Sequence, residues 1–309
     1  MSSEFINFSL NVIGPIVVLL AAGKILFATG QISDGFVAGG SKLVFNIALP
    51  ALLFISISQA DFGKAANPAM ITIGIVGTLA FFIAVLLVVR FSFQCRADRG
   101  VIVQGAFRAN LGVVGLAFAA KTFGDDDFAQ ASVYMGSLVL LYNVLSVWIL
   151  NHYLPKQLHW SATVKDTFTN PIVVAILMAL IFSYFELQLP KLLYISTEYF
   201  AQLTLPLALL CTGAAIRFRG MAGQYKALTF TTVCKCLLYP LLLVGAGIHF
   251  NLDAVELLTV LFMAIAPTAA VSFIMVKNMG GNADLAANIV AITTVISVPI
   301  TLMGYAFII

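Results

Sequence analysis

Four residues able to bind or orient a ligand stand inside stretches that are otherwise apolar enough to cross a membrane. Arg108 and Asn110 lie in the run FRANLGVVGLAF, and Pro267 interrupts AIAPTAAVSFIM 157 residues after Asn110. Lys235 lies in a third apolar run. Interrupted membrane helices at corresponding positions of two halves point to a transporter binding site. The N-terminal end of each second half-helix would offer N–H groups and a partial positive charge, which suits a carboxylate.

Other polar side chains within the apolar runs extend this candidate site. Tyr142, Asn143 and Ser146 share one face of a helix by their spacing, and a later run carries Thr293 and Thr294. Interhelical packing is the alternative interpretation of such residues, and Arg108 could instead reach the membrane interface. The candidate substrate-binding residues are Arg108, Asn110, Tyr142, Asn143, Lys235, Pro267, Thr268, Ser272 and Thr294, and the expected helix breaks are at Gly112 and Pro267.

The composition places these residues in an integral membrane protein. Of 309 residues 61% are hydrophobic and 9% are charged, with a mean hydropathy of +1.04, whereas soluble domains are about 25% charged. The net charge of +3 is spread over loop ends, which does not favour nucleic-acid binding. The histidines and cysteines lack metal-ligand spacing, and no paired mid-span carboxylates or Ser–His arrangement is visible. We therefore expect no metal, no cofactor and no enzymatic activity.

Apolar runs of about 20 residues recur along the whole chain, and each is long enough to cross a bilayer. The motif PIVV begins at Pro15 and again at Pro171, and LPALLF at Leu49 corresponds to LPLALL at Leu205. The two members of each pair are 156 residues apart. These offsets predict two five-helix repeats, residues 1–155 and 156–309, which are inverted because five is odd. Ten spans are expected, at about 8–28, 42–59, 69–89, 101–122, 129–151, 170–185, 195–216, 227–248, 256–276 and 284–307.

The distribution of Lys and Arg predicts that both termini face the outer side of the membrane. With that orientation eleven basic residues lie on the cytoplasmic side and three on the outer side, as positive-inside topology requires. The cytoplasmic set is Lys24, Lys42, Arg90, Arg96, Arg99, Lys156, Lys165, Arg217, Arg219, Lys226 and Lys277, and the outer set is Lys64, Lys121 and Lys191. A multi-pass protein of the plasma (inner) membrane is expected.

Several motifs together resemble the auxin efflux carrier family, the bacterial relatives of the plant PIN-FORMED carriers. This family belongs to a larger group that also holds the bile acid sodium symporters. They are LPALLF at 49, NLGVVGLAF at 110, YNVLSV at 142, NPIVVAI at 170, LPLALLCTGAAI at 205, KCLLYP at 235 and TTVISVPIT at 293. The resemblance implies a scaffold of helices 1, 2, 6 and 7, a moving transport domain of helices 3–5 and 8–10, and helices 4 and 9 crossing. It also implies a substrate beside Asn110 and Pro267 and a homodimer through the scaffold helices.

The sequence departs from the plant carriers in ways that bear on the substrate. Asn110 lacks the preceding proline of many plant members, Leu53 replaces a serine, and helix 3 lacks their charged pair. We therefore expect a small organic anion, auxin-like or a dicarboxylate, moved outward by alternating access. A proton- or sodium-coupled importer of malonate- or malate-like dicarboxylates is an alternative, and a membrane sensor that binds without transport is another.

Overall fold

The computed structural model describes residues 8–60, 67–155, 169–216, 221 and 223–309, and its regular elements there are helices. Lys64, Lys156, Lys165, Arg217 and Arg219, which enter the orientation argument, lie outside these residues. Contacts divide the chain into two compact units. The first unit comprises Met1–Pro68, Leu116–Ser137 and Lys165–Ala215, and the second comprises Ala69–Gly115, Leu138–Val164 and Ile216–Ile309.

Many helices are long and apolar enough to cross a membrane. Among the described residues six meet this condition: Ser9–Ala28, Asp34–Gln59, Pro68–Ser92, Asp125–Tyr153, Tyr225–His249 and Ala283–Ile308. Shorter apolar helices cover Leu111–Thr122, Pro171–Tyr184 and Ala254–Ile265. Large apolar side chains on these helices remain exposed, including Phe91, Met303 and Phe307, as lipid-facing surfaces require. The chain is a multi-pass membrane protein.

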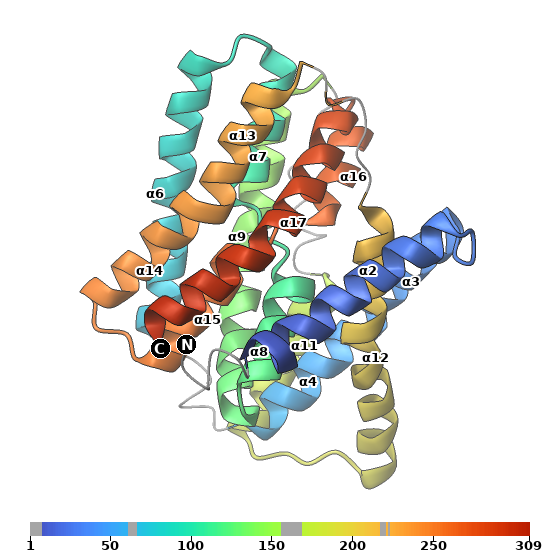
Figure 1. The fold of residues 1–309 in the computed structure, drawn as a ribbon. Helices are drawn as coiled ribbons and strands as arrows, with labels where there is room; N and C mark the ends of the chain where they lie inside the picture. Colours follow the sequence, from blue (N-terminus) through green and yellow to red (C-terminus); the bar gives the residue numbers. More distant parts are fainter. Residues whose placement is uncertain (1–7, 61–66, 156–168, 217–220, 222) are drawn as a thin grey trace. The chain divides into compact units, whose positions relative to one another are not determined.

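The first unit consists of two closely packed helix pairs (Figure 1). In one pair α2 crosses α12 where a Cβ on Gly23 would overlap the Leu210 carbonyl and one on Gly213 would overlap the Leu20 carbonyl. In the other pair α4 packs against α11. The elements of this unit are η1 (Ser9–Ile13), α2 (Gly14–Ala28), α3 (Asp34–Leu43), η2 (Val44–Ala48), α4 (Leu49–Gln59), α8 (Leu116–Thr122), α9 (Asp125–Tyr153) up to residue 137, α11 (Pro171–Tyr184) and α12 (Lys191–Ala215), with η marking π-helical turns.

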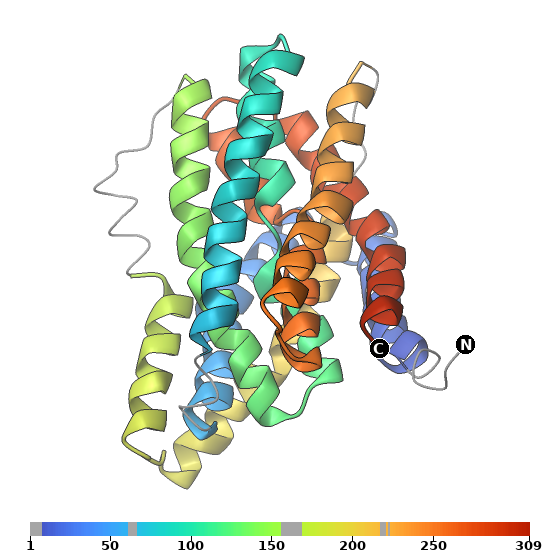
Figure 2. The same ribbon diagram turned by 90° about the vertical axis from the view of Figure 1, so that its left-hand side faces the viewer.

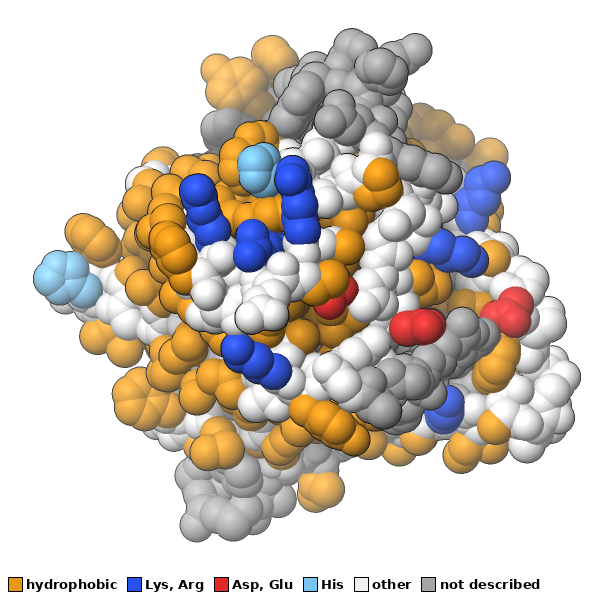
Figure 3. Space-filling view, turned by 90° about the horizontal axis from the view of Figure 1, so that it is seen from above, with side chains coloured by type: hydrophobic (Ala, Val, Ile, Leu, Met, Phe, Trp, Pro, Cys, Tyr) orange, Lys and Arg blue, Asp and Glu red, His pale blue; other side chains and the backbone are white. Residues whose placement is uncertain are grey.

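The second unit contains the remaining helices, and α6, α7 and α13 run side by side in it (Figures 1 and 2). Arg99 Nε and Lys226 Nζ donate to the Phe93 and Ser92 carbonyls at the end of α6, each over 2.7 Å. Figure 3 shows Lys and Arg side chains gathered on the face seen from above. The elements are α6 (Pro68–Ser92), α7 (Arg96–Phe107), η3 (Leu111–Gly115), the rest of α9, α13 (Tyr225–Val233), η4 (Cys234–Leu238), α14 (Tyr239–His249), α15 (Ala254–Ile265), α16 (Ala270–Asn278) and α17 (Ala283–Ile308).

Three of the π-helical turns end two residues before a proline. The residues preceding Pro15, Pro50 and Pro240 donate their N–H groups to carbonyls five residues back, from Gly14 to Ser9, Leu49 to Val44 and Tyr239 to Cys234. Proline has no N–H and its ring collides with the carbonyl four residues earlier. Widening the preceding turn relieves that collision without breaking the helix.

One expected helix boundary is wrong. The sequence around Asp34 is rich in glycine and was expected to form a loop before a helix starting near Lys42, but α3 already begins at Asp34. The Ser33 hydroxyl oxygen accepts a hydrogen bond from the Phe36 N–H and so caps the helix. Serine at this position compensates for the weak helix propensity of the glycines.

Candidate functional site

The structure interrupts a helix in both of the stretches singled out in the sequence. One helix stops at Phe107 and resumes at Leu111, and another stops at Ile265 and resumes at Ala270. Gly112 lies in the π-helical turn after the first interruption, whereas Pro267 lies within the second. Both interruptions belong to the second unit.

The two interruptions pair with each other as a short antiparallel bridge between Ala109 and Thr268. The Asn110 N–H donates to the Pro267 carbonyl over 2.7 Å, and the Ala269 N–H donates to the Arg108 carbonyl over 3.0 Å. Each segment therefore satisfies amides that its own helix has lost. The two interruptions thus form a backbone-paired junction, which we call the crossing (residues 108–110 and 266–269).

This pairing changes which N–H groups can face a ligand. The amides of Asn110, Thr268 and Ala269 are already bonded, although the sequence suggested that helix-end amides at the crossing would be unpaired. The first turns that follow begin at Leu111 and Ala270, and first-turn amides have no acceptor within their own helix. In α16 the Ser272 N–H already bonds the Ala269 carbonyl over 2.9 Å, so the first turn of η3 has more amides left for a ligand. An anion beside the crossing would therefore meet first-turn amides that follow it, and not the paired amides of the crossing itself.

Arg108 is buried, and only 7% of its surface is exposed. Its Nη1 donates to the Tyr142 carbonyl over 2.9 Å and to Ser146 Oγ over 2.7 Å, and its Nη2 donates to Asn143 Oδ1 over 2.8 Å. Its Nε is buried without a partner. Arg108 thus lies buried against α9 and does not extend to the membrane interface, and the three groups that accept its hydrogen bonds are uncharged.

Lys235 is fully buried in η4. Its Nζ donates to the Ala264 carbonyl over 2.5 Å and lies 4.9 Å from the centre of the Tyr239 ring. Tyr239 and Tyr142 share a hydroxyl–hydroxyl hydrogen bond of 2.7 Å, and Tyr239 shares another of 2.7 Å with Thr78. Two buried cations of the second unit are therefore linked through neutral groups on α9 and α14.

Neither buried cation has an acidic partner within the described part of the chain. A charge buried without a counter-ion costs several kcal/mol in a low-dielectric interior. A charged side chain inside a membrane span is a candidate functional residue by default. Their net effect is a positive potential within the unit that holds the crossing, which favours an anion.

The candidate residues around the crossing differ in whether their side chains have polar groups left to bond a ligand. Asn110 is 6% exposed, and no hydrogen bond of its carboxamide occurs among the described residues. The Ser272 hydroxyl is also buried without a partner. Thr268 uses its hydroxyl to bond the Gly105 carbonyl and its N–H to bond Thr293 Oγ1. Asn110 and Ser272 thus have unused polar groups, whereas Thr268 does not.

Sequence reasoning missed part of the network. Thr294 donates to the Val290 carbonyl of its own helix, while its neighbour Thr293 contacts the crossing. Gly105 and Tyr239 were not among the predicted site residues. Gly105 contributes only its backbone carbonyl, which no sequence pattern reveals, and Tyr239 lies in an apolar run, where an aromatic residue is expected to belong to the core. The alternation of Thr293 and Thr294 around the helix was visible, but not which of them faces inward.

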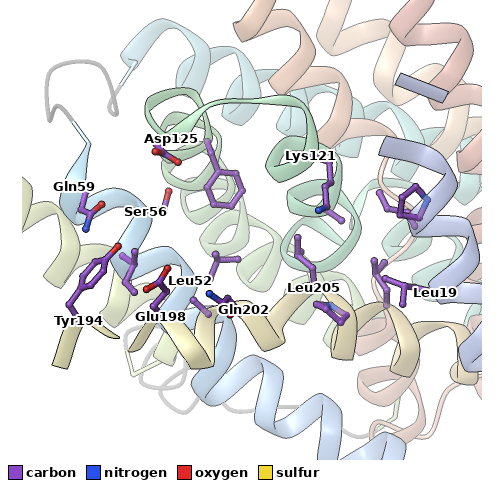
Figure 4. Close-up of a pocket in the computed structure, with 18 residues that line it drawn as sticks. Leu19, Leu52, Ser56, Gln59, Lys121, Asp125, Tyr194, Glu198, Gln202 and Leu205 are labelled. Carbon is purple, nitrogen blue, oxygen red and sulfur yellow. The ribbon is translucent and has the colours of Figure 1, made fainter. Parts of the chain in front are cut away.

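A separate cavity of about 620 Å³ lies in the first unit (Figure 4). Its polar lining includes the carboxylates of Asp125 and Glu198 and one cation, Lys121. Leu19, Leu52, Leu205 and other apolar residues line the remainder. None of the predicted site residues lines this cavity, and its excess of carboxylates opposes anion binding. The crossing is therefore the better candidate for an anion site.

Comparison with known proteins gives a family and several relatives. A family model described as a membrane transport protein matches residues 10–159 and 155–305. An "Uncharacterized transporter" of Methanothermobacter thermautotrophicus is 23% identical over 291 residues, which cover 91% of this chain and 92% of the relative. The "Uncharacterized transporter YfdV" of Escherichia coli K12 is 24% identical over 305 residues, which cover 92% and 94%. A relative of the same name in Shigella flexneri matches to the same extent.

Proposed function

Because the chain belongs to the membrane transport protein family, that of the auxin efflux carriers its motifs resemble, we propose that it is a secondary transporter of a small organic anion. The anion binds beside the crossing, next to the Asn110 carboxamide and the first turn of η3. The substrate class is a mono- or dicarboxylate. The full-length relatives named as transporters support the general activity, and the local chemistry supports the choice of an anion.

The observation that carries the proposal is the pair of buried cations without counter-ions. Arg108 and Lys235 bond only neutral groups, so the unit that contains them has an uncompensated positive interior. A carboxylate would supply the missing charge. The Asn110 carboxamide and the first backbone N–H groups of η3 add hydrogen-bond donors for a carboxylate.

The transport cycle we propose is alternating access between two domains. Helices 1, 2, 6 and 7 form the scaffold and helices 3–5 and 8–10 the moving domain, within ten spans arranged as two inverted repeats (residues 1–155 and 156–309). The helix pairs of the first unit support the repeat. An offset of 156 residues relates α2 to α11 and α4 to α12, so exchanging the halves converts the α2–α12 pair into the α11–α4 pair. The scaffold would also form the interface of a homodimer.

The outward direction that we propose rests on the membrane potential. In a plasma (inner) membrane, where we expect the chain to have both termini outside, the cell interior is the negative side whatever the orientation of the chain. That potential drives an anion outward by about 2.3 kcal/mol per charge per 100 mV. Export then requires no coupling ion, whereas an importer of the same anion would need a proton or sodium gradient.

Ligand binding to the purified protein tests the proposal. We expect malonate, malate or indole-3-acetate to raise the thermal unfolding temperature of the wild type. Asn110→Ala should abolish that rise, because it removes an unbonded carboxamide beside the site. Asn288→Ala is the matched control, since the Asn288 carboxamide bonds Gln224 Oε1 and the variant should retain the response. A carboxylate response that persists undiminished in Asn110→Ala would move the site elsewhere.

A further inference from the structure

The interruption before α16 deprives a specific carbonyl of its usual partner. In a continuous α-helix the Thr268 N–H would bond the Ala264 carbonyl four residues earlier. Here the Thr268 N–H bonds Thr293 Oγ1 over 3.0 Å instead. Since Pro267 has no N–H either, the last turn of α15 ends with carbonyls that its own helix cannot satisfy.

Lys235 occupies the position left by the Thr268 N–H. Its Nζ bonds the Ala264 carbonyl over 2.5 Å. A cation is well suited to that position, because the C-terminal end of a helix carries a partial negative charge. The ring of Tyr239, 4.9 Å from Nζ, adds a cation–π contact on another side of the ammonium.

The other interruption is closed in a comparable way. In a continuous helix the Gly105 carbonyl would accept from the Ala109 N–H. At the break the Thr268 hydroxyl donates to that carbonyl over 2.7 Å. Thr268 therefore spans the crossing, with its hydroxyl completing one broken helix while Thr293 and Lys235 complete the other.

The placement of Lys235 depends on its own helix. Lys235 lies in η4, the π-helical turn that Pro240 imposes on the chain between α13 and α14. Fully buried lysine is rare without an ionic partner, and Lys235 has none among the residues that the structure describes. The Ala264 carbonyl and the Tyr239 ring are the groups that stabilise its ammonium.

We propose that Lys235 is a positioning residue that holds open the interruption between α15 and α16. Its ammonium replaces the Thr268 N–H at the Ala264 carbonyl, while Thr293 Oγ1 accepts the Thr268 N–H. Lys235 thus acts on the substrate through the geometry of the crossing and is not itself a ligand. The importance of this role for transport rests on the proposed function. Its structural basis does not, and a measurement on the protein without substrate tests it.

Hydrogen–deuterium exchange of the purified protein in lipid nanodiscs measures the crossing directly. Lys235→Met removes the donor to the Ala264 carbonyl, so the crossing is no longer held in one geometry. We expect exchange about tenfold faster in peptides spanning 264–272 and 108–115, because the bonds of the Thr268, Ala269 and Asn110 amides then open more often. Lys226→Met is the matched control. Lys226 also donates to a helix-end carbonyl, that of Ser92, and lies over the Phe93 ring, so its loss should speed exchange near residues 89–95 alone.

Thr293→Val keeps the test decisive if Lys235→Met fails to fold. Valine retains the shape of threonine but removes the acceptor of the Thr268 N–H, so exchange should rise in the same two segments. Thr301→Val is the control, since buried Thr301 bonds only the Ser297 carbonyl of its own helix. The proposal is overturned if Lys235→Met and Thr293→Val leave exchange at the crossing within about twofold of the wild type, or if both controls accelerate it equally.

These results separate the inference from the proposed function. Local exchange that rises as expected in a protein that binds no carboxylate would keep Lys235 as a positioning residue and overturn the anion transporter. Carboxylate binding that survives with unchanged exchange in both variants would do the reverse.

Discussion

At the scale of single residues, the account rests on how Arg108 is held. Three neutral oxygens of α9 accept its hydrogen bonds, while its Nε remains buried and unbonded. The side chain is therefore fixed in place, and no carboxylate among these acceptors neutralises its charge. A fixed, uncompensated guanidinium is a source of positive potential for an anion and a source of instability in the empty protein.

Arg108→Gln should therefore separate binding from stability. It removes the charge, so the carboxylate-induced rise in unfolding temperature should disappear. The unfolding free energy of the protein without ligand should fall by at most about 3 kcal/mol. The cost of the broken hydrogen bonds is partly offset, because an unpaired charge is no longer buried. Chemical denaturation in detergent measures the stability, and a carboxylate response equal to that of the wild type would contradict this role.

Ser146→Ala provides the milder comparison at the same side chain. It removes one of the bonds to Arg108 Nη1 and leaves the charge, so we expect a loss of about 1 kcal/mol in unfolding free energy. Carboxylate binding should persist with weakened affinity. If Ser146→Ala abolished binding as completely as Arg108→Gln, the orientation of the guanidinium would matter more than its charge.

Asn110 and Asn288 make opposite predictions for stability. Asn288 is fully buried and bonds Gln224 Oε1 over 3.0 Å, so its replacement by alanine should destabilise the protein by about 1–2 kcal/mol. Asn110 has no such bond, and Asn110→Ala should leave the unfolding free energy within about 0.5 kcal/mol of the wild type. Denaturation midpoints of the two variants decide this, and a large loss for Asn110→Ala would make Asn110 a structural residue.

At the scale of helices, close contact between α2 and α12 depends on two glycines. A methyl group on Gly23 or Gly213 would overlap a backbone carbonyl of the other helix, and a backbone cannot move aside as a flexible side chain can. Small residues permit this kind of approach between membrane helices.

Gly23→Ala and Gly213→Ala should each destabilise the first unit by about 2 kcal/mol or more through overpacking. Gly39→Ala in α3 is the matched control, because open space surrounds Gly39 and alanine favours a helix by up to about 1 kcal/mol. Thermal unfolding in detergent tests all three. Equal tolerance of the three substitutions would show that α2 and α12 do not pack this closely.

Helix positions could be predicted from the sequence to a large extent, because runs of apolar residues fix where a membrane span is possible. The start of α3 was missed because one serine cap outweighs several glycines. The interruptions were visible at Asn110 and Pro267, but their pairing was not. The partners of Thr268 and Lys235 are decided by contacts between different helices, 163 residues apart for Thr268 and Gly105, 25 for Thr268 and Thr293 and 29 for Lys235 and Ala264. Spacing along the chain carries no record of these contacts.

At the scale of the whole molecule, the anion transporter needs a binding site that both sides of the membrane can reach in turn. The crossing and both buried cations belong to one compact unit, and the paired helices α2–α12 and α4–α11 belong to the other. This separation supports a moving domain that carries the substrate and a scaffold that does not. Neither unit alone accounts for transport, so flux must be measured on the intact chain.

Flux of labelled carboxylates from proteoliposomes tests the central claim most directly. Vesicles loaded with labelled malonate, malate or indole-3-acetate are compared with and without an inside-negative potassium diffusion potential, for the wild type and Asn110→Ala. We predict that the wild type releases at least one of these anions, that the potential speeds the release, and that Asn110→Ala abolishes it. Saturable binding without flux under either condition would contradict the account and indicate a sensor.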